Sequence, residues 1–358
     1  MPSFTLKNHL LLAFTLFLVS AAISLFIIKH TKILDIPNGR SSHSKPTPTI
    51  GGLAIVITFF LSMAILYFFA NTTMITERYF TGFTFSSLLI AGMSFYDDLK
   101  CKPFYIKLAT QIIAVIVVMS FGIIIHQINF PYNFLWFNYN SPGTASYVIT
   151  FCWILGMTNT YNFMDGLNGM AGGNAVIAAI FFCIISLDRG SNFTYMVSYT
   201  IAAGVLGFLI FNFPMGKLFM GDIGSTFLGF SFATLAIIAS LYDKAHTSLL
   251  IIPLLFFHFI YDTFFTFMRR MLNRENVFQP HRTHLYQLFN RLGYKHSTVT
   301  IFYCAVAILQ GFGALWLIKI AGLQRLFIFI PYLIFQIIYS CVIIYHSKQR
   351  GLLSSQVL

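Results

Sequence analysis

Apolar residues run through most of this chain in long stretches, separated by short segments that carry nearly all of the charges. Because an α-helix rises about 1.5 Å per residue, about 17 to 25 apolar residues are enough to cross the hydrocarbon core of a bilayer. The pattern therefore predicts an all-α, polytopic membrane protein in which residues 1–358 form one transmembrane domain. We expect eleven spans, near residues 9–28, 49–70, 80–96, 105–125, 145–163, 170–187, 193–213, 223–242, 247–268, 298–318 and 323–346.

The composition agrees with a membrane protein. Hydrophobic residues make up 57% of the chain and charged residues only 9%, whereas a soluble domain usually carries about 25% charged residues. No small-residue cleavage site follows the first apolar run, Leu10 to Ile28, so we expect that run to be retained as a span. The five cysteines are scattered without metal-ligand spacing, which indicates small buried residues instead of a disulfide or zinc framework.

Basic residues are divided unequally between the two ends of the expected spans. If the loops alternate sides, 16 of the 22 Lys and Arg residues lie on one side. The positive-inside rule assigns that side to the cytoplasm and places the N-terminus outside. The same rule accounts for the net charge of +12, so we expect no nucleic-acid partner. The cytoplasmic loops are expected near residues 29–48, 97–104, 164–169, 214–222 and 269–297.

Acidic residues are scarce, and most of them fall on or near the same side. Cationic side chains favour an anionic substrate, whereas carboxylates favour a metal ion. The combination predicts an active site at the cytoplasmic interface that handles an anionic substrate with a metal. The seven acidic residues on this side are Asp35, Asp97, Asp98, Asp165, Asp222, Asp262 and Glu275.

An aspartate pair ends the third expected span. Asp97 and Asp98 are adjacent, and Lys100, Lys102 and Lys107 follow closely. Two neighbouring carboxylates repel each other and are costly at the end of a membrane helix. A bound cation or a proton transfer explains the pair best, and a polar helix end that faces water is the alternative.

A second polar stretch ends the fifth expected span. Asn159, Asn162 and Asp165 are spaced by three residues, so they lie on one helical face. Gly166 and Gly169 then end the helix and permit a close approach of the backbone to a neighbour. The stretch predicts a ligand site, with a structural polar seam between helices as the alternative.

Three further segments carry candidate chemistry. Asp222 stands between glycines at the start of the eighth span, where free backbone N–H groups favour anions, although a plain helix cap is the alternative. The first basic loop ends in Gly51-Gly52, which lets the next helix begin against a close neighbour or ligand. The late loop contains His281-Arg282-Thr283-His284, which is typical of a phosphate-binding arm and only loosely of a metal motif.

Five segments taken in order resemble the polyprenyl-phosphate N-acetylhexosamine-1-phosphate transferases of glycosyltransferase family 4. They read RSSHSKPTPTIGG, FYDDLK, NTYNFMDGLNG, FMGDIGS and PHRTHLYQ. This superfamily includes the lipid I synthase of peptidoglycan assembly and the initiators of O-antigen and enterobacterial common antigen. The resemblance implies a multi-pass enzyme of the bacterial cytoplasmic (inner) membrane that joins undecaprenyl phosphate to the sugar phosphate of a UDP-N-acetylhexosamine and releases UMP. It also implies Mg²⁺, or Mn²⁺ in its place, and leaves a homodimer open.

The resemblance further implies roles for individual residues. The catalytic set is Asp97, Asp98, Asp222 and His284, with Asp222 and Asp98 as metal ligands and Asp97 as the base or positioner for the lipid phosphate. The substrate-binding set is Arg40, His43, Lys45, Lys107, Asn159, Asn162, Asp165, Asn168, Asn212, His281 and Arg282.

The chain departs from the better-known members at two places. Asn168 stands where many have a second Asp, so one charge is missing near the nucleotide or sugar. The late loop reads HRTHLYQ instead of ending in a double His, which argues against a muramyl-pentapeptide substrate. The chain therefore looks more like the O-antigen subgroup, which uses GlcNAc-like sugars or their 6-deoxy relatives.

Two mechanisms and one other class of protein compete with the simplest interpretation. We expect direct attack by the lipid phosphate on the sugar-proximal phosphorus, because this nucleophile needs little acid–base help. A covalent intermediate at Asp97 or Asp98 is the competing mechanism. A multi-pass transporter of an anionic substrate would instead hold its charges near the midplane of the membrane, often with repeated halves, and neither feature is found.

Overall fold

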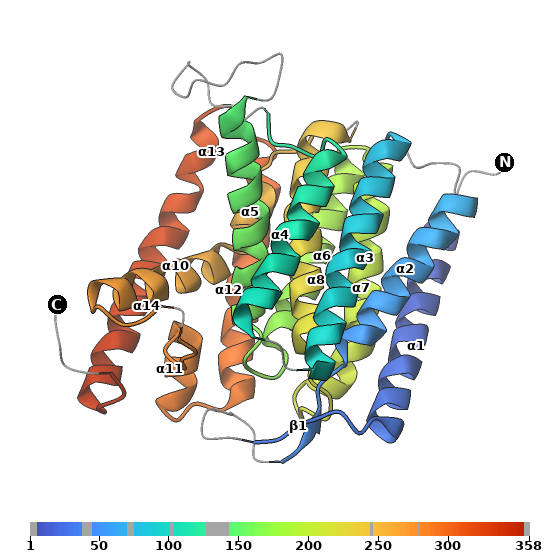
Figure 1. Ribbon diagram of the computed structural model, residues 1–358. Coiled ribbons are helices and arrows are strands. Elements are labelled where there is room, and N and C mark those ends of the chain that lie inside the picture. Colours follow the sequence, from blue (N-terminus) through green and yellow to red (C-terminus); the bar gives the residue numbers. More distant parts are fainter. Residues whose placement is uncertain are drawn as a thin grey trace.

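The computed structural model describes residues 6–37, 45–69, 75–100, 103–126, 143–243, 246–277 and 279–353. Most of the helices run side by side in one bundle (Figure 1). The helices are α1 (Leu6–His30), α2 (Gly52–Phe69), α3 (Glu77–Lys100), α4 (Phe104–Ser120), α5 (Thr144–Phe163), α6 (Met170–Asp188), α7 (Asn192–Asn212), α8 (Gly221–Ile237), the π-helix η1 (Ile238–Tyr242), α9 (Ile251–Leu255), α10 (Phe257–Leu272), α11 (Leu285–Arg291), α12 (His296–Leu317), α13 (Gln324–Phe327) and α14 (Phe329–Gln349).

Every expected span contains helix, which confirms an all-α membrane architecture. Among the described residues, seven helical segments are long and apolar enough to cross a membrane: α1, α2, α6, α7, α8 with η1, α12, and α13 with α14. The remaining expected spans fall short in length or hydropathy, since α4 has only 17 residues and α3 and α5 carry the polar motifs. The count of eleven spans stays a prediction.

The ninth expected span is broken. Helix α9 ends at Leu255, Phe256 interrupts the helix, and α10 then lies across the neighbouring helices in Figure 1. Polar residues spaced by four, His258, Asp262, Thr266 and Arg270, are all buried on one face of α10. Large apolar residues are exposed on its other side, Phe264 among them. A helix with a polar inner face and an apolar outer face is suited to lie against lipid while it holds polar groups inside the protein.

The centre of the bundle is built from helices with many small residues. Every residue of α8 from Ile223 to Ile237 is buried. At the start of this helix, a Cβ added to Gly52 of α2 would lie 2.3 Å from the backbone nitrogen of Gly224. Glycine at both positions lets the two helices approach closely, as in many membrane bundles.

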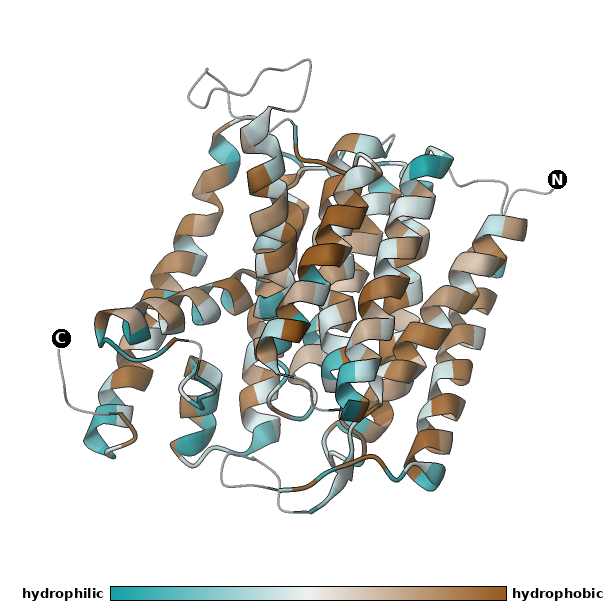
Figure 2. Ribbon diagram, viewed as in Figure 1, coloured by the Kyte–Doolittle hydropathy of each residue, from teal (hydrophilic) through white to brown (hydrophobic). Residues whose placement is uncertain are grey.

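One end of the bundle gathers the polar segments, at the bottom of Figure 2. The C-terminal ends of α3 and α5, the N-terminal ends of α4 and α8, and a small hairpin meet there. The hairpin pairs β1 (Leu34–Asp35) antiparallel with β2 (Thr47–Pro48). The N–H of Gly51 donates to Phe219 O over 2.8 Å, and that of Gly52 to Met220 O over 2.7 Å. The close approach expected at this glycine pair is therefore confirmed.

Candidate active site

A cavity of about 680 Å³ opens at the polar end of the bundle. Residues of all five motif segments line it, although these segments are spread from residue 40 to residue 287. Its volume lies in the usual range of small-molecule sites, about 300 to 1,000 Å³. The charged and polar residues of its wall include Asp35, Asp97, Asp98, Lys107, Asn162, Asp165, Asn168, Asn212, Asp222, Ser225, His281, Arg282, Gln287 and Asn290.

Lys107 forms the centre of the charged cluster. Its Nζ lies 2.5 Å from Asp97 Oδ2 and 2.5 Å from Asp222 Oδ2. The amide of Asn162 donates to Asp222 Oδ1 over 2.9 Å and to Ser225 Oγ over 2.8 Å. The tertiary structure thus brings α3, α4, α5 and α8 together through one ammonium group and one amide.

Asp98 has a different environment from its neighbour Asp97. Its two oxygens accept the backbone N–H groups of Asp222 (3.0 Å) and Ile223 (2.9 Å), in the first turn of α8. A carboxylate is stabilised there by the unpaired amides and the positive end of the helix dipole. In the structure Asp98 therefore caps the N-terminus of α8. Its role as a metal ligand stays a prediction.

Gly221 makes this arrangement possible. Its φ angle is +73°, and a Cβ at this position would lie 2.2 Å from Thr49 O and 2.8 Å from Asp98 Oδ2. Only glycine combines a left-handed conformation with so close an approach of two other segments. The glycine beside Asp222 therefore positions both carboxylates.

The polar stretch at the end of α5 is divided between two cavities. Asp165 lies just beyond the helix, which ends at Phe163, so the single helical face expected for all three residues holds only for Asn159 and Asn162. Asn162 and Asp165 line the large cavity. Asn159 lies one turn earlier, lines an adjoining cavity of about 200 Å³, and donates to Gln111 Oε1 (2.7 Å) and Leu155 O (2.8 Å). The structure thus places Asn159 in a polar seam between α4 and α5, outside the wall of the large cavity.

Asp165 is close to two other acids. Burial raises the pKa of Asp165 well above its ordinary value, and the carboxylates of Asp222 and Asp98 raise it further. Beside it, Gly166 meets Tyr286, whose hydroxyl would lie 2.1 Å from an added Cβ. The close approach expected at Gly166 is confirmed, with α11 as the neighbour.

Two asparagines of the wall hold backbone segments. Asn212 accepts the N–H of Gly169 over 2.6 Å and donates to Leu218 O over 2.8 Å, so it links the start of α6 to the turn before α8. Asn168 donates to Pro214 O over 3.3 Å. Asn212 is buried, with both ends of its amide engaged, so the structure gives it a supporting position.

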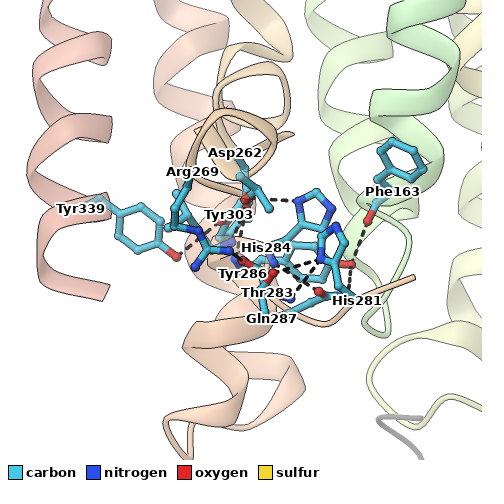
Figure 3. A network of polar contacts seen from close by, with 12 residues as sticks. Phe163, Asp262, Arg269, His281, Thr283, His284, Tyr286, Gln287, Tyr303 and Tyr339 are labelled. Atoms are coloured by element: carbon cyan, nitrogen blue, oxygen red, sulfur yellow. Dashed lines mark hydrogen bonds and ion pairs between the residues drawn. The ribbon is translucent and has the colours of Figure 1, made fainter. Parts of the chain in front are cut away.

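The late loop contributes only part of its predicted set. His281 and Arg282 line the large cavity. His284 lies outside that wall, is 6% exposed, and places Nδ1 3.3 Å from Asp262 Oδ1 (Figure 3). This placement gives His284 a supporting position, because its ring is held by a buried carboxylate.

Three residues of the first basic loop were predicted to bind substrate, and none of them is among the described residues that line the cavity: Arg40, His43 and Lys45. Lys45 is exposed and does not line the cavity. Arg40 and His43 lie outside the described residues, so their predicted roles stay predictions.

The sequence reasoning also missed residues of the wall. Ser225, Gln287 and Asn290 line the cavity, and Asp35 joins them from the hairpin. Ser225 lies three residues after Asp222, and this helical spacing was the available signal. Gln287 ends the late-loop motif, and its place in that motif was its signal. Asn290 extends the same face of α11 by one turn and carried no signal of its own.

The donor set fits a magnesium ion. The wall carries five aspartates against two cations in the described residues, Lys107 and Arg282, so an anionic substrate would meet an excess of negative charge. Lys107 already shows that a cation is accommodated between Asp97 and Asp222. Within the described part of the chain no three acidic, histidine or cysteine side chains form a ready metal cluster. Mg²⁺ is commonly held by one or two carboxylates together with substrate phosphates, so a closed cluster is not required.

Comparison with known proteins identifies the family. The model of glycosyl transferase family 4 matches residues 80–240. The chain is 30% identical to the "probable undecaprenyl-phosphate N-acetylglucosaminyl 1-phosphate transferase" of Bacillus subtilis, over 80% of this chain and 79% of the relative. It is 29% identical to the undecaprenyl-phosphate alpha-N-acetylglucosaminyl 1-phosphate transferase of Thermotoga maritima, over 94% and 96%. A phospho-N-acetylmuramoyl-pentapeptide-transferase of Staphylococcus saprophyticus is 26% identical, over 78% and 88%. The chain therefore belongs to glycosyl transferase family 4, among the membrane enzymes that transfer a sugar 1-phosphate to a polyprenyl phosphate.

Proposed function

We propose that this protein transfers an N-acetylhexosamine 1-phosphate from a UDP-sugar to undecaprenyl phosphate and releases UMP. The convergence of all five motif segments on one cavity carries the proposal. The names of the Bacillus and Thermotoga relatives favour N-acetylglucosamine as the sugar, and a 6-deoxy relative is the second candidate. The product would start a lipid-linked surface glycan such as O-antigen, on the cytoplasmic face of the inner membrane.

The reaction needs a nucleophile, a leaving group and compensation of charge. An oxygen of the lipid phosphate attacks the sugar-proximal phosphorus, a new P–O bond forms, and the P–O bond to UMP breaks with its electron pair on UMP. Asp97, at the wall beside Lys107, orients the lipid phosphate or accepts its proton. Lys107 supplies a fixed positive charge where negative charge is transferred.

Other residues hold the donor. Arg282 and His281 also line the cavity wall and supply donors for phosphate oxygens. Asp165 and Asn168 face the same cavity and suit hydroxyl or amide groups of the sugar or nucleoside. When bound, Mg²⁺ would act as a Lewis acid on the diphosphate, with Asp222 as its first ligand and Asp98 as the second.

The transporter alternative is not favoured. The carboxylates and cations that line the cavity lie at one end of the bundle, whereas a transporter site is expected near the midplane. The related proteins are named as transferases. Both observations agree with a transferase, and neither is expected for a transporter.

A reconstituted assay tests the proposal. Purified protein in nanodiscs is given undecaprenyl phosphate, Mg²⁺ and one of several UDP-amino sugars, and UMP release is measured. We expect release with UDP-N-acetylglucosamine or its 6-deoxy relative, and none without lipid or after chelation of the metal. Absence of UMP with every sugar, from protein that remains folded, would contradict the proposed function.

A further inference from the structure

A buried carboxylate stands behind the cavity and takes no part in the mechanism above. Asp262 of α10 is 1% exposed and lines neither cavity (Figure 3). Burying an ionised carboxylate is costly unless hydrogen bonds and charges compensate for the lost water. The partners of Asp262 therefore indicate what this residue does.

Most of these partners belong to the late loop and to α11. Asp262 Oδ1 accepts the N–H of Leu285 over 2.8 Å, and Oδ2 accepts that of Tyr286 over 3.1 Å. The hydroxyl of Tyr303 on α12 donates to Oδ2 over 3.0 Å. One carboxylate thus joins α10, α11 and α12 where the late loop enters α11.

Asp262 also fixes a histidine. His284 Nδ1 lies 3.3 Å from Asp262 Oδ1, and an ionised carboxylate can only accept, so Nδ1 of His284 carries the hydrogen. The ring of His284 stacks on that of His281, with centroids 4.9 Å apart and planes inclined by 30°. The buried carboxylate therefore supports the ring on which His281 rests.

His281 is in turn held in one tautomer. Its Nδ1 accepts the backbone N–H of Thr283 over 3.3 Å and lies 3.1 Å from Thr283 Oγ1. A backbone N–H only donates, so the hydrogen of the neutral ring is on Nε2. Burial and the nearby His284, Arg270 and Arg269 lower the pKa of His281 to about 3. At neutral pH this residue is a neutral donor on the cavity wall.

Two arginines fix the loop backbone between the histidines. Arg269 donates to Thr283 O over 2.8 Å, and Arg291 donates to Arg282 O over 3.1 Å. The backbone carbonyls of Arg282 and Thr283 are thus held by residues of α10 and α11. The side chains of His281 and Arg282 line the cavity. Such support from behind is what keeps binding groups in a productive geometry.

We propose that Asp262 is a positioning residue, which acts through His284 and the start of α11 to hold His281 as an Nε2–H donor and Arg282 as a cation toward the diphosphate of the sugar nucleotide. The inference rests on the proposed function. It predicts that Asp262 affects the binding of the nucleotide sugar without touching it.

The central variant is Asp262→Asn, which keeps the volume but replaces one accepting oxygen with an NH₂ group. We expect KM for the UDP-sugar to rise about tenfold or more, the cost of a lost charge-assisted hydrogen bond, with a smaller fall in kcat. Hydrogen exchange of the backbone over residues 281–288 should become faster.

Asp243→Asn is the matched control. Asp243 is also 1% exposed, and it accepts a hydrogen bond from Thr194 Oγ1 over 2.8 Å. Thr194 lies near the start of α7, at the end of that helix away from the cavity. We expect that control to leave KM unchanged.

A double-mutant cycle separates positioning from general stability. If Asp262 acts through His281, then Asp262→Asn should cost much less in a His281→Ala background than alone. His281→Gln retains a neutral donor near the position of Nε2, so it should recover most of the activity that His281→Ala loses, with an unchanged pH profile between pH 5.5 and 8. A general acid or base at this position would not be replaced by Gln.

Failure of this inference and failure of the proposed function give different results. Unchanged KM and unchanged exchange over 281–288 in Asp262→Asn, or strictly additive losses in the cycle, would overturn the inference. If Asp262→Asn does not fold, Tyr303→Phe removes one donor to Asp262 Oδ2 with little change of shape, and unchanged KM and unchanged exchange over 281–288 in that variant would overturn the inference as well. If wild-type protein turns over no UDP-sugar, the proposed function fails, and faster exchange in Asp262→Asn but not in Asp243→Asn still supports the anchoring of the loop.

Discussion

At the scale of single residues, Asp222 and Lys107 carry opposite charges at one point of the cavity wall. The amide of Asn162 and the ammonium of Lys107 both donate to the Asp222 carboxylate. Asp222→Asn keeps the shape but loses the charge that holds Lys107 and would attract a metal ion. We expect the variant to fold in detergent and to lose more than about 10³-fold in kcat, the scale of a lost electrostatic contact in a transition state. Near-normal UMP release by folded Asp222→Asn would remove this residue from the proposed metal site.

Asp97 separates direct attack from a covalent intermediate. If it only orients or deprotonates the lipid phosphate, Asp97→Asn should lose about 10² to 10⁴ in rate. That loss should shrink above about pH 6, the second pKa typical of phosphate monoesters, because the lipid phosphate then loses its proton unaided. The check is a pH series with Asp97→Asn, together with a search for radiolabelled sugar phosphate bound to wild-type protein in the absence of lipid. A trapped label that disappears in Asp97→Asn would instead establish the covalent route.

At the scale of elements, the site depends on the first turn of α8, where Asp98 and Thr49 both approach Gly221 closely. Gly221→Ala would bring a Cβ to 2.2 Å from Thr49 O and place alanine at φ +73°. The left-handed conformation costs about 1 to 2 kcal/mol, and the clash with a backbone carbonyl must in addition move the hairpin or α8. We expect lower thermal stability and a large loss of activity, because Asp98 and Asp222 would both shift.

Two glycines provide matched controls for that variant. Gly190 also has a positive φ, +72°, but an added Cβ would meet nothing within 4 Å, so Gly190→Ala isolates the conformational cost. Gly156 lies within α5 with open space around it, so Gly156→Ala should be neutral or slightly stabilising. Activity in Gly221→Ala equal to that in Gly190→Ala would show that the close approach of Thr49 and Asp98 is unimportant.

At the scale of the whole molecule, the unequal distribution of basic residues predicts the orientation in the membrane. The cavity end contains Asp98 and His284, and the first basic loop contains Arg40. Single cysteines at these three positions should resist an impermeant thiol reagent in intact cells, and the cysteine at Arg40, in the first basic loop, should react after permeabilisation. A cysteine at Lys7, near the other end of α1, should react in intact cells. Labelling of the first three without permeabilisation would reverse the topology.

Several features could be predicted from the order of residues alone, because they depend on local spacing. Helix positions followed from the length of apolar runs, and the close backbone approaches at Gly51-Gly52 and Gly166 followed from glycines beside polar motifs. Family membership followed from five segments in a fixed order and is confirmed by comparison with known proteins. A motif that contacts a phosphate or a metal needs particular residue types at particular intervals, so the sequence retains this information.

Other features depend on segments that are distant in the chain, and only the tertiary structure decided them. The pair Asp97-Asp98 looks uniform in the sequence, yet one carboxylate faces Lys107 and the other caps α8. His284 looks like a site residue, yet it lies behind the wall because Asp262 of another helix accepts its hydrogen. The break at Phe256 and the inner polar face of α10 are hidden in an apolar run, since the run shows length but not which side faces the protein. Local spacing determines which groups are available, whereas packing across the bundle determines which of them reach the cavity.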